Sequence, residues 1–122
     1  MKILLTSLIL SFFALSSDIS KAIQNSDANQ LSSFFNATVE LDILGEEASY
    51  SQTQAAQVIK RFFTNYPVDS YKVIHTGKAK DGSSFQIGSL ISRGGEFRTH
   101  LLLKGNGVNQ KIHEFRVEAE NE

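Results

Sequence analysis

Cysteine is the most informative absence in this chain. The 122 residues include no cysteine, no tryptophan and a single proline. Without cysteine, the chain has no disulfide bond, no thiol chemistry and no metal site built on thiolates. It also lacks the thiol that carries the lipid of a bacterial lipoprotein just after its signal peptide. We therefore expect a fold held by its hydrophobic core alone, without a lipid anchor of that kind.

The chain also lacks an excess of charge of either sign. It carries 12 lysine and arginine residues against 13 aspartate and glutamate residues, a formal net charge of −1 at pH 7. No basic tract interrupts this balance. Proteins that bind nucleic acid or anionic membranes through their charge usually carry such a tract. We therefore expect neither kind of partner.

Long hydrophobic runs are scarce, and the first one lies at the N-terminus. Lys2 precedes an apolar run, which ends in the small-x-small pattern of Ala14-Leu15-Ser16. This is typical of a secretory signal peptide. We expect residues 1–16 to be removed and residues 17–122 to form one periplasmic or secreted domain. Beyond Ser17 no apolar run approaches the roughly 20 residues of a membrane-spanning helix, so no stable membrane insertion is expected after cleavage.

Two segments have the spacing of helices. From Ile19 to Phe35 apolar residues recur at steps of three and four, interrupted at residues 25–27, which predicts one bent helix or two short ones. The second segment is clearer. Ser51 and Gln54 match a capping box, an apolar stripe follows, and Pro67 helps to end the helix.

The rest of the chain indicates strands separated by turns. We expect strands at residues 38–43, 68–76, 85–92, 96–104 and 110–118, with a turn at residues 45–47 and a short extended link at residues 48–50. Helices placed before an antiparallel sheet predict an α+β fold, in which a curved antiparallel sheet wraps around the N-terminal helices. The predicted aromatic core consists of Phe34, Phe35, Phe62, Phe63, Phe85, Phe97 and Phe115.

These segments resemble a known superfamily. Residues 22–35, followed by the strand around Val39, look like the opening of the nuclear transport factor two-like superfamily, the cystatin-like α+β cones. A narrower resemblance is to a domain-of-unknown-function family of small exported Bacteroidetes proteins. It rests on Tyr50-Ser51, Gln54-Ala55, Phe62-Phe63, His75, Ile87-Gly88 and Phe97-Arg98. The resemblance spans about residues 17–118, and it implies an apolar pocket under a curved sheet, often in a homodimer.

The superfamily leaves the function open, because its members include both enzymes and binding proteins. Its ketosteroid isomerases combine a tyrosine and a carboxylic acid as the oxyanion hole with an aspartate base. No such set aligns here, since Asp42 and Asp69 fall on an expected solvent face and at a strand start. We therefore assign no catalytic residue, and we expect no metal and no cofactor.

Two strand residues are candidates for ligand binding. His75 shares its strand parity with Tyr71 and Val73, so Tyr71 and His75 are expected to face the same side of the sheet, with His75 at a pocket mouth. A histidine there would act as an acid or base near neutral pH.

Arg98 is the third candidate for ligand binding. It shares a strand face with Glu96 and His100, opposite Phe97. One interpretation is a wall that recognises an anion, with Arg98 as the charge-assisted donor. The other is a solvated sheet face with cross-strand ion pairs, and this is the interpretation that we favour.

The three histidines allow one more hypothesis. His75, His100 and His113 each lie in an expected strand, and converging imidazoles would bind zinc or act as acid and base. Close-spaced pairs are missing, so we favour structural or exposed histidines.

Three functions follow as hypotheses. The leading one is a bacterial exported domain, without catalysis, that binds a small apolar ligand or a protein partner through its cone mouth or sheet face. The second is a cofactor-free lyase or isomerase that uses His75 with Tyr71 or a nearby carboxylate. The third is a structural module that forms a homodimer through an exposed sheet face with Lys72, Ile74 and Leu102.

Overall fold

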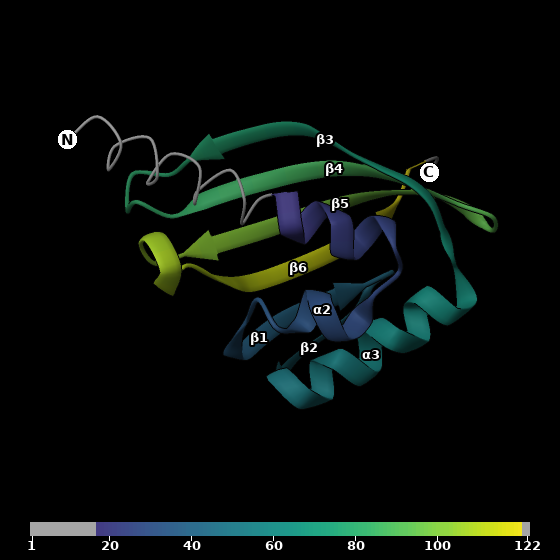
Figure 1. Ribbon diagram of the computed structural model, residues 1–122, viewed down its shortest axis with the longest axis horizontal. Helices are drawn as coiled ribbons and strands as arrows, with labels where there is room; N and C mark the ends of the chain where they lie inside the picture. Colours follow the sequence, from purple (N-terminus) through teal and green to yellow (C-terminus); the bar gives the residue numbers. More distant parts are fainter. Residues whose placement is uncertain (1–16, 121–122) are drawn as a thin grey trace.

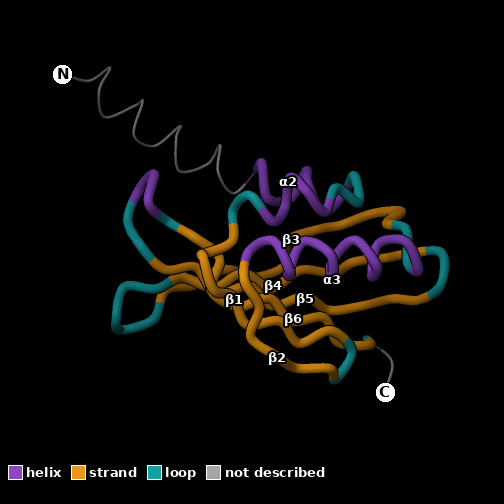
Figure 2. Tube along the Cα trace, turned by 90° about the horizontal axis from the view of Figure 1, so that it is seen from below, coloured by secondary structure: helices purple, strands orange, loops and turns teal. Residues whose placement is uncertain are grey.

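A curved sheet with helices on one of its faces makes up the computed structural model (Figures 1 and 2). The structure describes residues 17–120, so the expected signal peptide lies outside the described residues. The helices are residues 17–24, α2 (Ala28–Ser32) and α3 (Gln52–Asn65). The strands are β1 (Phe35–Ile43), β2 (Glu46–Ser51), β3 (Val68–Lys78), β4 (Ser84–Ser92), β5 (Gly95–Lys104) and β6 (Lys111–Ala119), with a short 3₁₀ helix, η1 (Gly107–Asn109), before β6.

The first helical region is divided into two short helices, as one of the two sequence alternatives predicted. Ser26 has a positive φ of 53°, which ends the helix at residues 17–24. The Asp27 carboxylate then accepts a hydrogen bond from the backbone N–H of Gln30 at 3.0 Å and caps α2. The hydroxyl oxygen of Ser26 accepts a hydrogen bond from the backbone N–H of Val68 at 2.9 Å, which ties this bend to the start of β3.

The main helix, α3, begins and ends where the sequence predicts. The Ser51 hydroxyl accepts a hydrogen bond from the Gln54 N–H, and the Gln54 side chain accepts one from the Ser51 N–H, both at 3.2 Å. The helix ends before Tyr66 and Pro67. Its buried face packs against α2, β1 and β2 and comprises Ala55, Ile59, Phe62 and Phe63.

The six strands lie in the order β2-β1-β6-β5-β4-β3. All neighbours are antiparallel except β1 and β6, which run parallel. Two details differ from the sequence prediction. Residues 46–50 of the expected turn and link belong to a strand, β2, and the actual turn is Leu44-Gly45. The sheet is also not wholly antiparallel as expected, because β6, the last strand, lies between β1 and β5 and runs parallel to β1.

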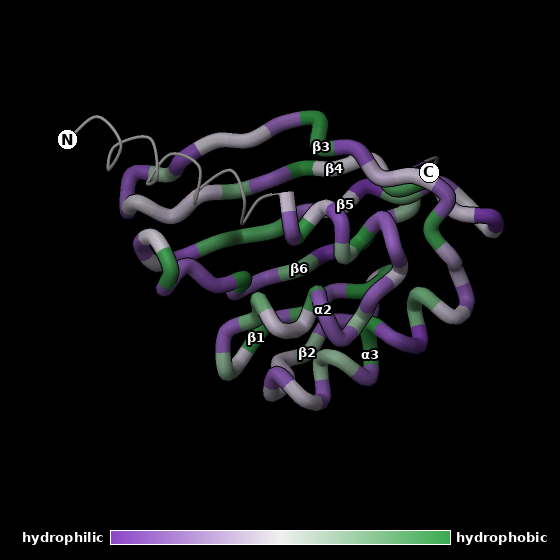
Figure 3. Tube along the Cα trace, in the orientation of Figure 1, coloured by the Kyte–Doolittle hydropathy of each residue, from purple (hydrophilic) through white to green (hydrophobic). Residues whose placement is uncertain are grey.

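The core lies between the helices and the inner face of the sheet. Hydrophobic and hydrophilic positions alternate along the chain (Figure 3), and the fully buried side chains include Phe35, Leu41, Ile59, Leu90 and Phe115. Of the predicted aromatic core, Phe35, Phe62, Phe63, Phe97 and Phe115 are buried, and Phe34 is half-buried.

The prediction that Phe85 belongs to the core is wrong. On β4 the buried positions are Gln86, Gly88, Leu90 and Ser92, so Phe85 points to the outer face, opposite the helices. There it pairs across strands with Leu102 of β5 and Gly77 of β3. The Phe85 ring lies directly over Gly77, where a Cβ atom would clash with it. Glycine at this position therefore makes room for an aromatic ring on the outer face.

The third strand, β3, contains two register shifts. Its pairing with β4 slips between Val68 and Ser70, and again between Val73 and His75. Each slip inserts one extra residue, which is a β-bulge. A bulge reverses the side-chain alternation beyond it, so parity counted along the sequence fails in this strand.

The fold is the expected α+β class, with a curved six-stranded sheet. Within residues 17–120, none of the helices has both the length and the apolar character that crossing a lipid bilayer requires.

Candidate functional site

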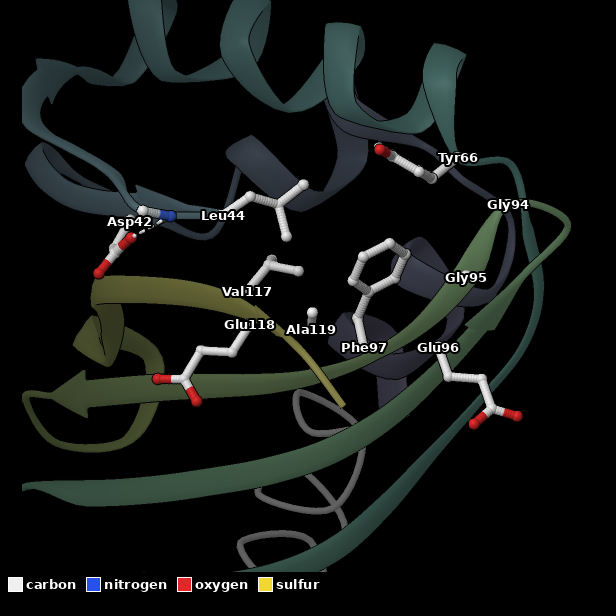
Figure 4. Close-up of a pocket in the computed structure, with 11 residues that line it drawn as sticks. Asp42, Leu44, Tyr66, Gly94, Gly95, Glu96, Phe97, Val117, Glu118 and Ala119 are labelled. Carbon is white, nitrogen blue, oxygen red and sulfur yellow. Dashed lines mark hydrogen bonds between the residues drawn. The ribbon is translucent and has the colours of Figure 1, made fainter. Parts of the chain in front are cut away.

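An open cleft of about 780 Å³ lies at one end of the sheet, beneath the C-terminal end of α3 (Figure 4). We call it the mouth cleft. It is formed where β1 ends, β5 begins and β6 ends, together with the turn that joins β4 to β5. Its lining residues are Asp42, Leu44, Gly45, Tyr66, Gly94, Gly95, Glu96, Phe97, Val117, Glu118 and Ala119.

Apolar side chains converge on the centre of the mouth cleft. Figure 4 shows Leu44, Val117 and Phe97 pointing toward one another beneath α3, with Tyr66 at its end. The rings of Tyr66 and Phe97 are 4.9 Å apart at an interplanar angle of 74°, an edge-to-face pair. Phe62 of α3 contacts both rings at centroid distances of 5.3 and 5.5 Å. Phe62, Tyr66 and Phe97 therefore contact one another and form an aromatic wall on one side of the cleft.

Two glycines allow this wall to lie close to the backbone. A Cβ atom on Gly94 would lie 3.1 Å from the Tyr66 ring, and one on Gly95 would lie 3.2 Å from the Phe97 ring. Both distances are shorter than ordinary van der Waals contacts. The Gly94-Gly95 pair, which the sequence identifies only as a turn, thus also shapes the cleft.

Leu44 is the most unusual residue of the mouth cleft. It has a φ of 55° and is followed by Gly45 with a φ of 92°, so both central residues of the β1–β2 turn have positive φ. Type I′ hairpin turns require this geometry and strongly favour Asn-Gly, because leucine is strained there. The Leu44 side chain is nevertheless 40% exposed, and it points into the cleft.

The turn that holds Leu44 is well fixed. The Leu44 N–H donates a hydrogen bond to the Val117 carbonyl at 2.9 Å, and the Asp42 carboxylate accepts one from the Gly45 N–H at 3.1 Å. The leucine is therefore held in place over the cleft by both β1 and β6. Its positive φ conflicts with the residue preference of this turn, which makes Leu44 a candidate functional residue.

All the charged residues that line the mouth cleft are acidic. Asp42 caps the turn, and Glu118 lies 3.1 Å from Arg116 and 3.8 Å from the imidazole of His100. Within residues 17–120, the Glu96 side chain forms no hydrogen bond or ion pair, and it is exposed. The cleft is therefore apolar at its centre, and its three carboxylates point away from that centre, on the outer face of the sheet (Figure 4).

A smaller groove of about 280 Å³ adjoins the mouth cleft along α3. The two hollows share Leu44 and Tyr66. The groove adds Val58 and Phe62 to the apolar surface, and it places Arg61 and Glu46 at its edge. Leu44 and Tyr66 thus lie where the mouth cleft and the groove meet, and the two hollows together form a longer apolar surface.

Tyr71, a sequence candidate for ligand binding, lies on the inner face of the sheet, away from the mouth cleft. Its side chain is 5% exposed. Its hydroxyl is 3.2 Å from the Thr99 hydroxyl and accepts a hydrogen bond from the Gln86 side-chain amide at 3.1 Å. Burial raises the pKa of Tyr71 above its ordinary value, while these two hydrogen bonds partly oppose the rise. The role of Tyr71 in ligand binding stays a prediction.

His75 does not share a face with Tyr71 and Val73, so that sequence prediction is wrong. The bulge between Val73 and His75 reverses the alternation, and His75 pairs with the outward-facing Ile87. His75 is exposed, and its ring lies 5.6 Å from the Phe85 ring. The hypothesis of a lyase or isomerase required His75 inside a concave apolar pocket, and this geometry contradicts that requirement.

Arg98 lies on the outer face together with Glu96 and His100, as the sequence predicts. Its guanidinium forms an ion pair with the Glu120 carboxylate at 2.7 Å. The Nε2 atom of His100 is buried and has no hydrogen bond partner in the described part of the chain. This geometry matches the expected solvated face with cross-strand ion pairs, and binding of a ligand by Arg98 stays a prediction.

The structure does not bring the three histidines together. His75 and His100 flank Ile87 on the outer face, and His113 lies at the β5–β6 register shift. Burial, and secondarily the nearby Lys104, lowers the pKa of His113. Within residues 17–120, no group of three or more histidine, aspartate or glutamate side chains has the geometry to hold a metal ion.

Sequence reasoning missed Leu44 as a site residue because the turn was placed one residue too late. The signal that was available is the Leu44-Gly45 pair itself. Asparagine is favoured before the glycine of a tight hairpin turn. A hydrophobic residue at that position indicates that its side chain has a role other than forming the turn.

Comparisons with known proteins agree with this fold. The chain matches a family described as a domain of unknown function, DUF4783, over residues 16–118. A DUF4783 protein from Bacteroides ovatus is 30% identical, with 86% of this chain and 94% of that chain covered and a TM-score of 0.79. One from Bacteroides uniformis is 26% identical, with 87% and 97% covered and a TM-score of 0.80.

A more distant likeness concerns the fold alone. A nuclear transport factor two-like protein of unknown function from Silicibacter pomeroyi is 13% identical, with 94% of this chain and 98% of that chain covered and a TM-score of 0.64. No curated protein matches the sequence.

Proposed function

Because this chain belongs to the DUF4783 family, for which no catalytic or other specific function is identified, we propose its function from its own site. We propose that it is an exported bacterial domain that binds a small apolar ligand in the mouth cleft, without catalysis. The fold is nuclear transport factor two-like, and this fold by itself supports no particular activity. The proposal therefore rests on the cleft.

One observation carries the proposal, namely the position of Leu44. An exposed leucine in a left-handed conformation costs stability, and asparagine or glycine would remove that cost. Such local conflicts with the folding rules concentrate at functional sites. The side chain covers a cleft of about 780 Å³, which lies within the usual range of small-molecule sites, about 300–1,000 Å³.

Leu44→Asn tests this proposal, with octanol as a neutral apolar probe. We expect octanol to bind about three- to tenfold more weakly, which equals a loss of about 0.7–1.4 kcal/mol of apolar contact. The free energy of unfolding should rise by about 1 kcal/mol, because asparagine adopts a positive φ more easily. Amide chemical-shift titration measures the first quantity, and urea unfolding measures the second.

Val108→Asn is the matched control. Val108 is 89% exposed in η1, and it does not line the mouth cleft. This variant should leave octanol binding unchanged. If Leu44→Asn instead lowers stability and leaves binding unchanged, Leu44 serves the fold and the proposed site is wrong.

Export is the second part of the proposal. It is supported by the apolar run after Lys2 and by the Ala14-Leu15-Ser16 pattern. We expect the protein, expressed in its natural host type, to leave the cytoplasm and to begin at residue 17. Cell fractionation followed by N-terminal sequencing measures this. A full-length chain in the cytoplasmic fraction contradicts it.

A homodimer is the second candidate function, and the outer face of the sheet favours it. Phe85 and Leu102 form a cross-strand pair on this face and line a shallow hollow of about 230 Å³. Ile74 and Ile91 are 47% and 41% exposed. An apolar patch of this kind on a sheet face is typical of a surface that meets another protein.

A further inference from the structure

We propose that the ligand of the mouth cleft is an unbranched alkyl chain that ends in a carboxylate. The tail of the chain lies in the mouth cleft, its middle lies in the adjoining groove along α3, and its carboxylate binds to Arg61 and Asn65. This inference rests on the proposed function, since it names the ligand class of the same cleft.

The mouth cleft and the groove form one continuous surface. Leu44 and Tyr66 line both hollows, so a ligand that leaves the cleft between these two side chains enters the groove directly. Ile43 and Phe62 are buried at the base of the groove, and Val58 adds to its apolar surface. Val58 and Tyr66 are eight residues apart, which is roughly 12 Å along a helix axis. A compact molecule fits one hollow, whereas an extended chain occupies both.

The side of α3 that faces the groove combines apolar and polar residues. Val58, Phe62 and Tyr66 follow one another at steps of four residues, so they lie on one side of the helix. Arg61 and Asn65 are also four residues apart, and both line the same groove. Hydrogen bond donors therefore lie directly beside the apolar surface of α3.

Arg61 and Asn65 have donors that are free to bind a ligand. Within residues 17–120, neither side chain forms a hydrogen bond or an ion pair, and both are exposed. A guanidinium matches the two oxygens of a carboxylate, and such charge-assisted hydrogen bonds are stronger than those between neutral groups. Arg61 lies roughly 7–8 Å from Tyr66 along the helix axis. A chain with its carboxylate at Arg61 therefore reaches the mouth cleft past Tyr66.

The centre of the mouth cleft suits the apolar end of this ligand. The three carboxylates that line the cleft point away from its centre, on the outer face of the sheet (Figure 4). Leu44, Phe97 and Val117 point toward one another at that centre. An alkyl tail therefore meets apolar side chains in the cleft, and the charged end of the ligand lies in the groove.

Glu46 opposes the binding of a carboxylate in the groove. It lines the groove from the start of β2, whereas Arg61 lines it from α3. Within residues 17–120, no ion pair joins these two side chains. The negative charge of Glu46 repels a bound carboxylate across the groove. Removal of this charge should therefore strengthen the binding of the ligand.

Arg61→Gln tests the position of the carboxylate, with decanoate and decanol as probes. We expect decanoate to bind about two- to fivefold more weakly, the range for an exposed ion pair, and decanol to bind as it does to the wild type. Glu46→Gln should strengthen decanoate binding and leave decanol unchanged. Lys60→Gln is the matched control, because Lys60 is an exposed cation of α3 that lines neither hollow. Amide chemical-shift titration measures each affinity.

Val58→Thr tests whether the chain occupies the groove. The probes are decanol, which is linear, and 1-adamantanol, a compact alcohol with the same number of carbon atoms. We expect decanol to bind about two- to fivefold more weakly, because a hydroxyl replaces a methyl group at the groove. The affinity for 1-adamantanol, which fits the mouth cleft alone, should stay the same. Val108→Thr is the matched control, since Val108 is exposed and lines neither hollow.

The outcomes distinguish this inference from the proposed function. If Arg61→Gln leaves decanoate binding unchanged, or Glu46→Gln weakens it, the inference is wrong. It is also wrong if Val58→Thr affects decanol and 1-adamantanol equally. In these cases the cleft still binds apolar ligands if Leu44→Asn weakens all three probes. If no probe binds, or none is affected by Leu44→Asn, the proposed function itself fails.

Discussion

At the scale of single residues, the contacts of Tyr71 indicate a role in stabilising the fold. Its hydroxyl, Thr99 and Gln86 form a buried polar cluster within an otherwise apolar inner face. Gly88 lies beneath the Tyr71 ring, and a Cβ atom there would clash with it. Buried polar groups need partners, so this cluster fixes the position of β3 over β4 and β5.

Tyr71→Phe tests whether this cluster stabilises the fold. The variant removes the hydroxyl from Thr99 and Gln86, so we expect the free energy of unfolding to fall by about 1–3 kcal/mol. Because burial raises the pKa of Tyr71, the folded state keeps a proton near pH 10 that the unfolded state releases. Wild-type stability should therefore decline as the pH rises through 10, and the variant should lack this component. Urea unfolding between pH 7 and 10.5 measures both effects.

Tyr50→Phe is the matched control for this experiment. Tyr50 is half-buried in β2, and its hydroxyl has no hydrogen bond within residues 17–120. Its replacement should change stability by less than about 0.5 kcal/mol. If Tyr71→Phe is equally harmless but abolishes octanol binding, Tyr71 is a ligand-binding residue, as the sequence predicted.

At the scale of elements, local signals predicted α3 and failed in β3. The Ser51 and Gln54 capping box and Pro67 act within a few residues, so the sequence contains the whole explanation of where α3 begins and ends. The bulge before His75 depends on which residue of β4 faces β3. No local pattern in β3 encodes that choice, so the face of His75 was predicted wrongly.

The second strand and Phe85 illustrate the same limit. β2 is an edge strand whose residues are mostly exposed, so it has little of the hydrophobic alternation by which strands are identified. Phe85 is hydrophobic but faces outward, because the inward positions of β4 are taken by Gln86 and Gly88, which accommodate the Tyr71 side chain. Hydrophobicity alone does not identify the inner face of a strand that carries hydrophobic side chains on both faces.

At the scale of the whole molecule, the outer face of the sheet determines whether two copies associate. The helices cover only the inner face (Figure 2), and the outer face carries Phe85, Ile87 and Leu102 between charged residues. Covering this apolar patch with a second copy would remove it from water. The same face carries the ion pairs of Arg98 and Arg116, and Arg116 lines the hollow formed by Phe85 and Leu102, so a second copy would have to accommodate its charge.

Sedimentation at micromolar concentration tests the homodimer. We expect the wild type to sediment as a dimer and Leu102→Lys as a monomer, because a lysine in the centre of the patch cannot be buried without a partner. Val108→Lys is the control, since it adds the same charge at an exposed position in η1 and should remain dimeric. A monomeric wild type contradicts this second candidate function.

The sequence by itself determined the α+β class, the family resemblance, the cap of α3 and most of the strands, because these depend on periodicity and on contacts within a few residues. Only the tertiary structure decided that β6 lies between β1 and β5, that His75 faces outward and that Leu44 lies over the mouth cleft. Each of these depends on segments far apart in the chain. The cleft itself is formed by α3, β1, β5 and β6 together, so none of these segments contains it alone.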